Sequence, residues 1–526
     1  MIPNARNDPP SRSLGIQSFL ARPAGTPVII ILAICILAAP VWLFADSLRY
    51  SRMILDDFAY AGASRSFSKT MTNLFVPHNA HIVPAWRLLT WAIVAASGNL
   101  ANLPANFGRA AIAVVPLVML ATGILVGRET RSTSAGLVAM AASGTTSILR
   151  MPATWYSAGQ TFWAGLGILL TLLALQSWRR SGGAWRLGLA AVWAVIAGGF
   201  WTIGHLAGPA GCVYLLADGR SSARRAAVVP ILATVVAVVV SFAMGARKIE
   251  VDIKFEGTDR DKAINFTRGA SHTLQSISET LVIGNLGVAA ETQPVQAAVL
   301  SLSLLGLWLW TFRNGGRPSP LEWAGGVILL GAYFISWSFR GYYTFENLRN
   351  VVPWYDTIPH LGAVLFASGW WSRVWQVQGA EPARLSRGGA FGIVVVALGL
   401  VAIHQPRATV LFVKEAPKMT AAELKKLPIL ELQRLRAVAY REVISQWQRD
   451  HLYRLDRAER VAQKAGIGLD LIHQTFGRVL APILPEAYDA AELLNLPRKG
   501  TETNPERARE LLGPLFRLEP EPKLSL

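Results

Sequence analysis

Long apolar segments recur along most of the chain and are separated by short stretches that carry arginine. Several of these segments reach the roughly 20 residues that an α-helix needs to cross about 30 Å of hydrocarbon. Because a backbone in lipid must satisfy its own hydrogen bonds, such segments predict membrane-spanning helices. Of the 526 residues, 52% are hydrophobic and 16% are charged, whereas soluble proteins average about 25% charged residues. We therefore predict an all-α polytopic membrane protein.

The net charge of +18 does not point to a nucleic acid partner. The basic residues lie mostly in short loops between apolar segments, and the positive-inside rule accounts for that distribution. Cys35 and Cys212 both fall inside apolar segments, so we expect two buried thiols and no disulfide framework.

The alternation of Arg-rich and Arg-poor loops predicts the orientation of the spans. It gives about 11 spans, with the N-terminus in the cytoplasm and the C-terminus outside. We expect the membrane to be the inner (plasma) membrane of a bacterium. We interpret the first span as retained, with a cleaved signal peptide as the alternative. The predicted spans are 27–45, 110–127, 135–149, 161–177, two spans within 187–216, 226–245, 295–312, 321–339, 358–371 and 390–404.

The apolar segment Ile82 to Ser97 contains Pro84 and Arg87. If it crossed the membrane, the Arg-rich loops that follow would face outward, so we predict an amphipathic helix on the outer surface. The chain then divides into a cytoplasmic segment 1–26, a transmembrane domain 27–404 with outer loops 46–109, 246–294 and 340–357, and a soluble, mainly helical extracytoplasmic domain 405–526.

The first outer loop carries two adjacent carboxylates, Asp56 and Asp57, and then His78 and His81. A carboxylate in a partly desolvated pocket can act as a general base, because burial raises its pKa; a solvated loop pair is the alternative. Asp and His together would allow a divalent metal, whereas hydrogen-bonding or exposed histidines would not involve one.

The acidic stretch LDDF is followed by HNAHIVPAWRLLTWAIVAASGNL and then by FGRAAIAVVPLVML at the second span. This order resembles the beginning of a GT-C type membrane glycosyltransferase, in which the first outer loop carries an acidic motif and a surface helix follows. The resemblance covers roughly Pro27 to Ser177, with weaker support from RGYYTFENLRN and WYDTIPHLG. Many relatives have another acidic residue between the third and fourth spans, but RMPATWYSAGQ contains none. A second acid and a two-carboxylate metal site are therefore left unassigned.

The resemblance implies inverting transfer of a sugar from a polyprenyl-phosphate carrier to an acceptor hydroxyl outside the cytoplasm. The acceptor would be a glycan, a lipid or a protein. By position, Asp57 or Asp56 would be the base, and we favour Asp57. A departing phosphate requires cations at the outer surface, although Arg and Tyr also anchor proteins at membrane interfaces. The substrate-binding candidates are His78, His81, Arg340, Tyr342, Tyr343, Glu346 and Arg349, with Asp356 as a further residue that would orient sugar hydroxyls or pair with the arginines.

Two other classes of function fit a polytopic chain with a soluble outer domain. A transporter or lipid flippase usually places ionisable residues at the bilayer midplane, whereas the middles of these spans are almost free of charge. A membrane scaffold would depend on the domain 405–526 to bind an envelope partner.

Overall fold

The computed structural model describes residues 25–44, 56–64, 66–78, 81–97, 103–149, 152–153, 155–245, 273–274, 276–278, 294–315, 317–340, 353–377 and 387–410. Within these ranges the chain is 89% helical and has no strands, which confirms the all-α prediction for this part of the protein. Four helical segments are long and apolar enough to cross a membrane, namely Thr26–Leu43, Ala105–Thr130, Ser157–Ser181 and Ser221–Gly245. The count of about 11 spans stays a prediction.

Every predicted span overlaps a helix of the structure. These helices are α2 (Thr26–Leu43), α7 (Leu103–Thr130), α8 (Thr133–Gly144), α10 (Gln160–Ser181), α11 (Ala184–Phe200), α12 (Ala207–Leu216), α14 (Val228–Gly245), α16 (Pro294–Gly315), α17 (Pro320–Arg340), α18 (Thr357–Val377) and α19 (Arg387–Val410). Shorter helices connect or cover them: α4 (Asp56–Ala63), α5 (Phe67–Asn73), α6 (Pro84–Ala96), α13 (Ser221–Ala226), and the single-turn or short 3-10 helices η2 (Ser147–Leu149), η3 (Ser157–Gly159), η4 (Thr202–Leu206) and η8 (Pro353–Asp356).

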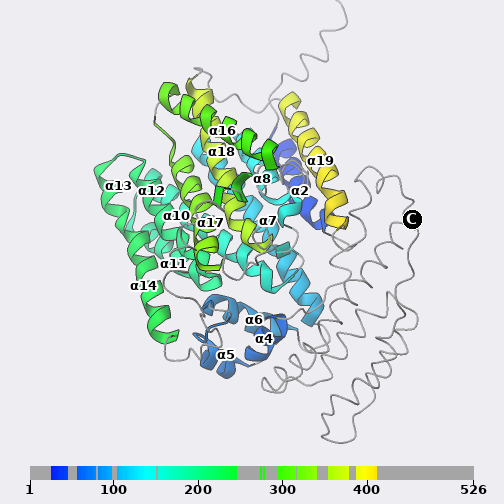
Figure 1. The fold of residues 1–526 in the computed structure, drawn as a ribbon, viewed down its shortest axis with the longest axis vertical. Helices are drawn as coiled ribbons and strands as arrows, with labels where there is room; N and C mark the ends of the chain where they lie inside the picture. The colour runs from blue at the N-terminus through cyan, green and yellow to red at the C-terminus, as the bar shows by residue number, and fades with distance from the viewer. Residues whose placement is uncertain are drawn as a thin grey trace, which may run out of the picture.

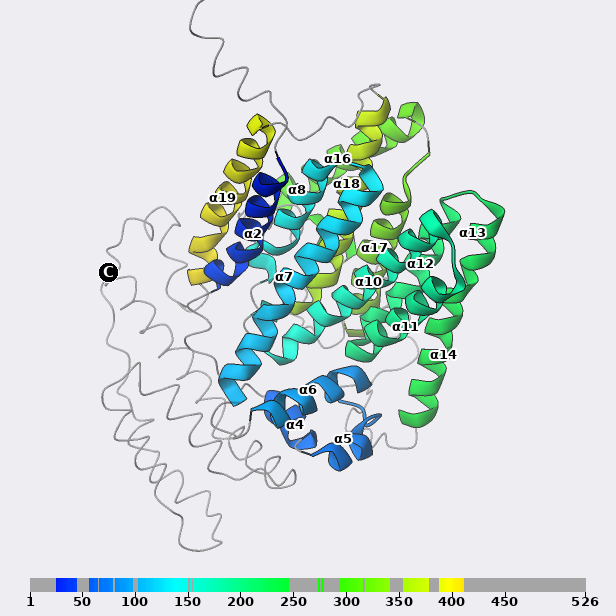
Figure 2. The same ribbon diagram turned by 180° about the vertical axis from the view of Figure 1, so that it is seen from behind.

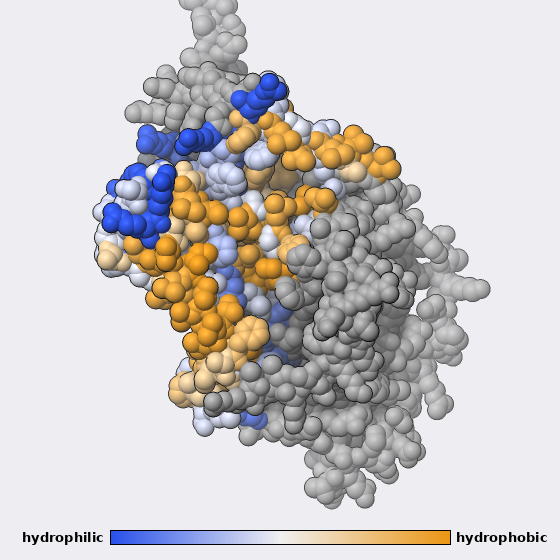
Figure 3. Space-filling view, turned by 60° about the vertical axis from the view of Figure 1, so that its left-hand side comes forward, coloured by the Kyte–Doolittle hydropathy of each residue, from blue (hydrophilic) through white to orange (hydrophobic). Residues whose placement is uncertain are grey.

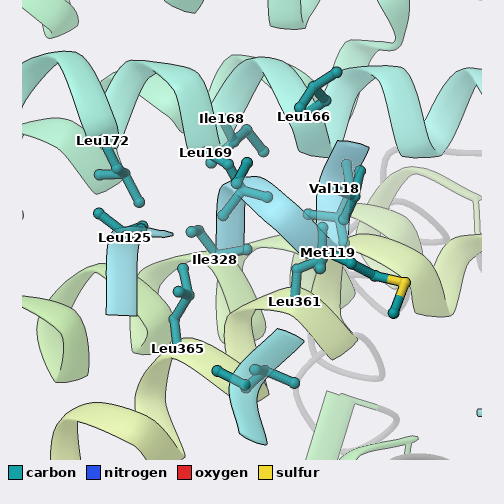
Figure 4. Packing of buried hydrophobic residues seen from close by; sticks show 14 of the residues in the cluster. Val118, Met119, Leu125, Leu166, Ile168, Leu169, Leu172, Ile328, Leu361 and Leu365 are labelled. Atoms are coloured by element: carbon teal, nitrogen blue, oxygen red, sulfur yellow. The ribbon is translucent and has the colours of Figure 1, made fainter. Parts of the chain in front are cut away.

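The centre of the bundle is formed by α7, α10, α17 and α18. Their buried side chains interdigitate, and Leu125, Leu169 and Leu365 are examples (Figure 4). Helices α17 and α18 pack closely because glycines face each other: a Cβ on Gly362 would lie 2.8 Å from the carbonyl oxygen of Gly325. Small residues of this kind let membrane helices approach each other, since dispersion contacts replace the hydrophobic effect in lipid.

Helices at the periphery of the bundle expose apolar side chains. Leu232, Val239 and Phe242 on α14 are each more than half exposed. Figure 3 shows this apolar surface beside a hydrophilic region near α13, where Arg220 and Arg224 are exposed. An apolar surface of this extent on a helix bundle is typical of contact with lipid.

Helices α4, α5 and α6 lie together across one end of the bundle, which we call the capped end (Figures 1 and 2). Helix α6 corresponds to the predicted surface helix 82–97. It begins at Pro84 and packs against α11, where a Cβ on Gly199 would lie 3.0 Å from the Cβ of Ala85. With 13 residues α6 is too short to span about 30 Å of hydrocarbon.

The opposite end of the bundle holds a network of charged residues. Arg179 on α10 contacts Glu129 on α7 at 2.6 Å, and Arg220 contacts Asp218 at 2.5 Å. The phenol of Tyr214 donates to Glu129 at 2.5 Å. These contacts join the ends of α7, α10 and α12 at the loops that the sequence predicts to be cytoplasmic.

Candidate active site

At the capped end, Asp57 is fully buried and is bonded to Ser157. The backbone N–H of Ser157 donates to Oδ1 of Asp57 at 2.9 Å, and the Ser157 hydroxyl donates to the same oxygen. Asp57 lies in the first turn of α4, whereas Ser157 begins η3, which follows α8 in the chain. The contact therefore joins the first predicted outer loop to the loop between the third and fourth predicted spans, and two donors stabilise the negative charge of the carboxylate.

Aromatic residues form the wall beside this carboxylate. Tyr156 stacks on Phe107 at 3.8 Å and on Trp86 at 4.4 Å, measured between ring centroids. Its hydroxyl lies 2.8 Å from Oγ1 of Thr90 on α6. Burial raises the pKa of the Tyr156 phenol well above its usual value; the Thr90 hydrogen bond opposes this shift, and the charge of Asp57 adds to it. The phenol is therefore protonated at neutral pH.

Tyr60 connects α4 to His78 and to α6. It lies one helical turn after Asp57, and its ring centroid is 4.4 Å from that of His78. The guanidinium carbon of Arg87 lies 5.7 Å from the Tyr60 centroid, within the range of a cation–π interaction. Tyr60 thus connects two predicted site residues: His78 contacts its ring, and Asp57 lies one turn before it on α4.

The two histidines of the H-x-x-H pattern contact different parts of the molecule. Their backbones pair as an antiparallel bridge, with N–H to O distances of 2.8 Å in both directions. Nδ1 of His81 lies 2.8 Å from Oγ1 of Thr202 on η4, and its ring centroid lies 6.0 Å from that of Trp201. His81 therefore extends the site toward η4, away from the Tyr60 contact of His78.

A second buried carboxylate, Asp356, closes η8 directly before α18. It accepts a hydrogen bond from the Tyr333 hydroxyl at 2.7 Å. Next to it, Thr357 accepts a hydrogen bond from Thr161 at 3.1 Å, and Thr161 lies one turn beyond Ser157. Burial raises the pKa of Asp356 to about 8, although the Tyr333 hydrogen bond opposes the shift. Asp356 is therefore largely protonated at neutral pH.

A metal site receives no support from the part of the chain that the structure describes, in which no three His, Cys, Asp or Glu residues are grouped to hold an ion. The sequence had allowed a divalent metal bound by Asp and His. Of these candidate ligands, Asp57 contacts Ser157, and His78 contacts Tyr60.

The other predicted site residues lie wholly or partly beyond what the structure describes. Asp56 is the first residue of α4 and Arg340 the last residue of α17, and their side chains are not described. Tyr342, Tyr343, Glu346 and Arg349 are outside the described residues, as is the predicted domain from residue 411 onward. Their roles stay predictions.

Sequence reasoning missed three residues that the fold brings to this site: Ser157, Tyr156 and Arg87. The stretch RMPATWYSAGQ was noted only because it lacks a carboxylate. Its polar and aromatic residues directly before a span were the available signal, because Tyr at a span end often has a polar partner. The position of Arg87 inside an apolar segment was the second signal, because ionisable residues in such segments are often functional.

No protein-family model and no curated protein sequence matches the chain.

Proposed function

We propose that the protein is an inverting GT-C-like glycosyltransferase that moves a sugar from a polyprenyl-phosphate carrier to an acceptor hydroxyl on the extracytoplasmic face of the membrane. The observation that carries the proposal is the buried Asp57 carboxylate at the capped end, with two hydrogen-bond donors from Ser157 on one oxygen. A carboxylate fixed in this way is suited to accept a proton from a hydroxyl placed beside it.

In the proposed reaction, the acceptor oxygen attacks the anomeric carbon while its proton passes to Asp57. The bond from the anomeric carbon to the phosphate oxygen breaks, and polyprenyl phosphate leaves with the electron pair. Attack opposite the leaving group inverts the anomeric centre. Because Asp57 is closed to solvent, the acceptor must displace part of the protein that covers it.

The eleven-span arrangement and the outward orientation of the capped end belong to this proposal. Support comes from the position of charge in the apolar helices. Glu129 and Arg179 lie in the last turn of α7 and α10, and Glu322 lies in the first turn of α17. These residues are at the end opposite α6. Arginine at that end agrees with the positive-inside rule if the end is cytoplasmic, and the two glutamates pair with arginines, Glu129 with Arg179 and Glu322 with Arg373.

The transporter alternative would need ionisable residues near the middle of the spans. In the described parts of α2, α8, α12 and α14 no residue is charged. The carboxylates Asp57 and Asp356 lie at the capped end instead, which favours chemistry at the membrane surface.

The test is mass spectrometry of envelope glycans and glycolipids from a strain that lacks the gene. The strain is complemented with wild type, Asp57→Asn, Asp56→Asn or Asp218→Asn, the last being a control at the opposite end of the bundle. We expect a sugar modification to be lost on deletion, restored by wild type and Asp218→Asn, and not restored by Asp57→Asn. Restoration by all variants, including an Asp56/Asp57 double substitution, would rule out these carboxylates as the base.

A further inference from the structure

Arg87 on α6 is a buried cation without a carboxylate partner in the described part of the chain. Its side chain is 4% exposed, and its one hydrogen bond runs from Nη2 to the carbonyl oxygen of Val76 at 2.9 Å. Nε of Arg87 has no acceptor. The guanidinium also lies over the ring of Tyr60, with its carbon 5.7 Å from the ring centroid.

The other deeply buried arginine of the described residues differs in this respect. Arg373 is 5% exposed, and it holds Glu322 through two hydrogen bonds, Nε to Oε1 at 3.0 Å and Nη2 to Oε2 at 2.8 Å. A guanidinium removed from water without an anion loses hydration that a carbonyl and a ring replace only in part. The Arg87 guanidinium therefore retains the capacity to bind an anion.

The preceding residue carries a second buried donor without an acceptor. The indole of Trp86 is fully buried and its Nε1 has no acceptor. Trp86 and Arg87 both contact Tyr60, with Trp86 at 6.3 Å between centroids. Burial also lowers the pKa of Arg87 from its ordinary value, while the neighbouring Tyr60 opposes this shift. Guanidinium groups nevertheless stay protonated in proteins, so Arg87 keeps a positive charge that attracts an anion.

We propose that Arg87 binds the phosphate of the polyprenyl-phosphate carrier at the capped end. The Nε edge of the guanidinium would donate to a phosphate oxygen, for which its planar fork is suited. The identity of the carrier lipid rests on the proposed function. The expectation that an anion binds here rests on the burial and contacts of Arg87. The phosphate contact thus moves from the predicted loop 340–357 to α6, where Arg87 contacts Tyr60 on the same α4 helix that carries Asp57.

The opposing interpretation is that Arg87 only ties α6 to the Val76 carbonyl. Binding measurements on the full-length protein, in nanodiscs of zwitterionic phosphatidylcholine with zero net charge, distinguish this interpretation from phosphate binding. The probes are a polyprenyl monophosphate, the matched polyprenol without phosphate, and inorganic phosphate. The variants are Arg87→Gln, Arg87→Lys and the matched control Arg109→Gln, which removes an exposed arginine of α7 that bonds only Asn106 among its side-chain partners.

We expect wild type and Arg109→Gln to bind polyprenyl phosphate at least tenfold more tightly than polyprenol. Arg87→Gln should lose this preference while its binding of polyprenol is unchanged, and Arg87→Lys should keep part of it. An equal preference in wild type and Arg87→Gln, or no preference in wild type, would overturn the inference. If inorganic phosphate binds in an Arg87-dependent way without any preference for the lipid, the carrier assignment is overturned.

Hydrogen exchange provides a measurement that needs no substitution. In wild type, polyprenyl phosphate should slow exchange in residues 76–96 more than polyprenol does, and equal exchange with the two lipids would contradict the proposal. Binding is measured without transfer, so the two proposals can fail separately. Arg87-dependent phosphate binding in a protein that transfers no sugar would contradict only the proposed function.

Discussion

Ser157 places two hydrogen-bond donors on a single carboxylate oxygen of Asp57, although the two residues lie 100 positions apart in the chain. The contact joins α4, which lies outside the helix bundle, to the 3-10 turn that starts α10. Because both partners are buried, the contact fixes the position of the short α4 helix on the bundle as well as the orientation of the carboxylate. The following substitutions test this relationship and three others.

Ser157→Ala removes the hydroxyl donor and leaves the backbone donor in place. Hydrogen bonds to charged groups contribute about 1.5–3 kcal/mol, so we expect the free energy of unfolding to fall by about that amount. Denaturant unfolding of the detergent-solubilised protein measures it. The control is Ser181→Ala. Ser181 is exposed at the end of α10, where its hydroxyl bonds the Ser177 carbonyl, and its substitution should change the stability by less than about 0.5 kcal/mol. Equal stability of the two variants would contradict the assigned role of Ser157.

Tyr156→Phe keeps the stack with Phe107 and Trp86 and removes only the hydroxyl that bonds Thr90. The expected loss is about 1 kcal/mol for one neutral hydrogen bond. Thr90→Val should cost a similar amount, and the double variant should cost less than the sum of the two, because both single changes remove the same contact. A thermodynamic cycle of the four proteins measures the coupling, and strict additivity would show that the two hydroxyls do not interact.

Asp356 predicts a pH dependence of stability. Its pKa is raised to about 8 in the folded protein, so the folded state holds a proton that the unfolded chain releases near pH 4. The resulting stability is complete below about pH 4 and is lost as the pH rises toward about 8, with a slope of at most about 1.4 kcal/mol per pH unit. The melting temperature should therefore fall from pH 5 to pH 8, and Asp356→Asn should flatten this fall.

Asp218→Asn is the matched control for that pH series. Burial raises the pKa of Asp218, but hydrogen bonds from Arg220 and Arg179 outweigh it and lower the pKa below its usual value. Stability from this lowered pKa is present above about pH 4 and is lost only at lower pH. The slope between pH 5 and pH 8 should thus be the same in Asp218→Asn and wild type. A slope that survives in Asp356→Asn would assign it to another group.

Arg373→Met leaves Glu322 buried without its cation. Removing one partner of a buried ion pair costs about 3–5 kcal/mol, and we expect a loss of that size in unfolding of the solubilised protein. The double substitution Arg373→Met with Glu322→Gln removes both charges and should recover part of the loss, since an amide can still bond the indole N–H of Trp308. A double variant that is less stable than Arg373→Met would contradict this account.

The sequence predicted the helical class and the positions of the apolar helices, because both depend on the hydrophobicity of successive residues. The segment 82–97 forms a helix as predicted, and α6 covers the end of the bundle. Its location on the outer membrane surface stays a prediction, and the short helices α4 and α5 were not predicted. The roles of Arg340, Tyr342, Tyr343, Glu346 and Arg349 were inferred from a short loop whose side chains the structure does not describe, and they stay untested.

What the sequence by itself determined is local: which apolar segments form helices, and that carboxylates and histidines follow the first of them. Hydropathy and charge act on neighbouring residues, so these features can be read without a fold. Only the tertiary structure decided that Asp57 meets Ser157, that His78 and His81 have different partners, and that Arg87 is buried without a carboxylate. Such contacts depend on how distant helices pack, and desolvation of a charge exists only once that packing has excluded water.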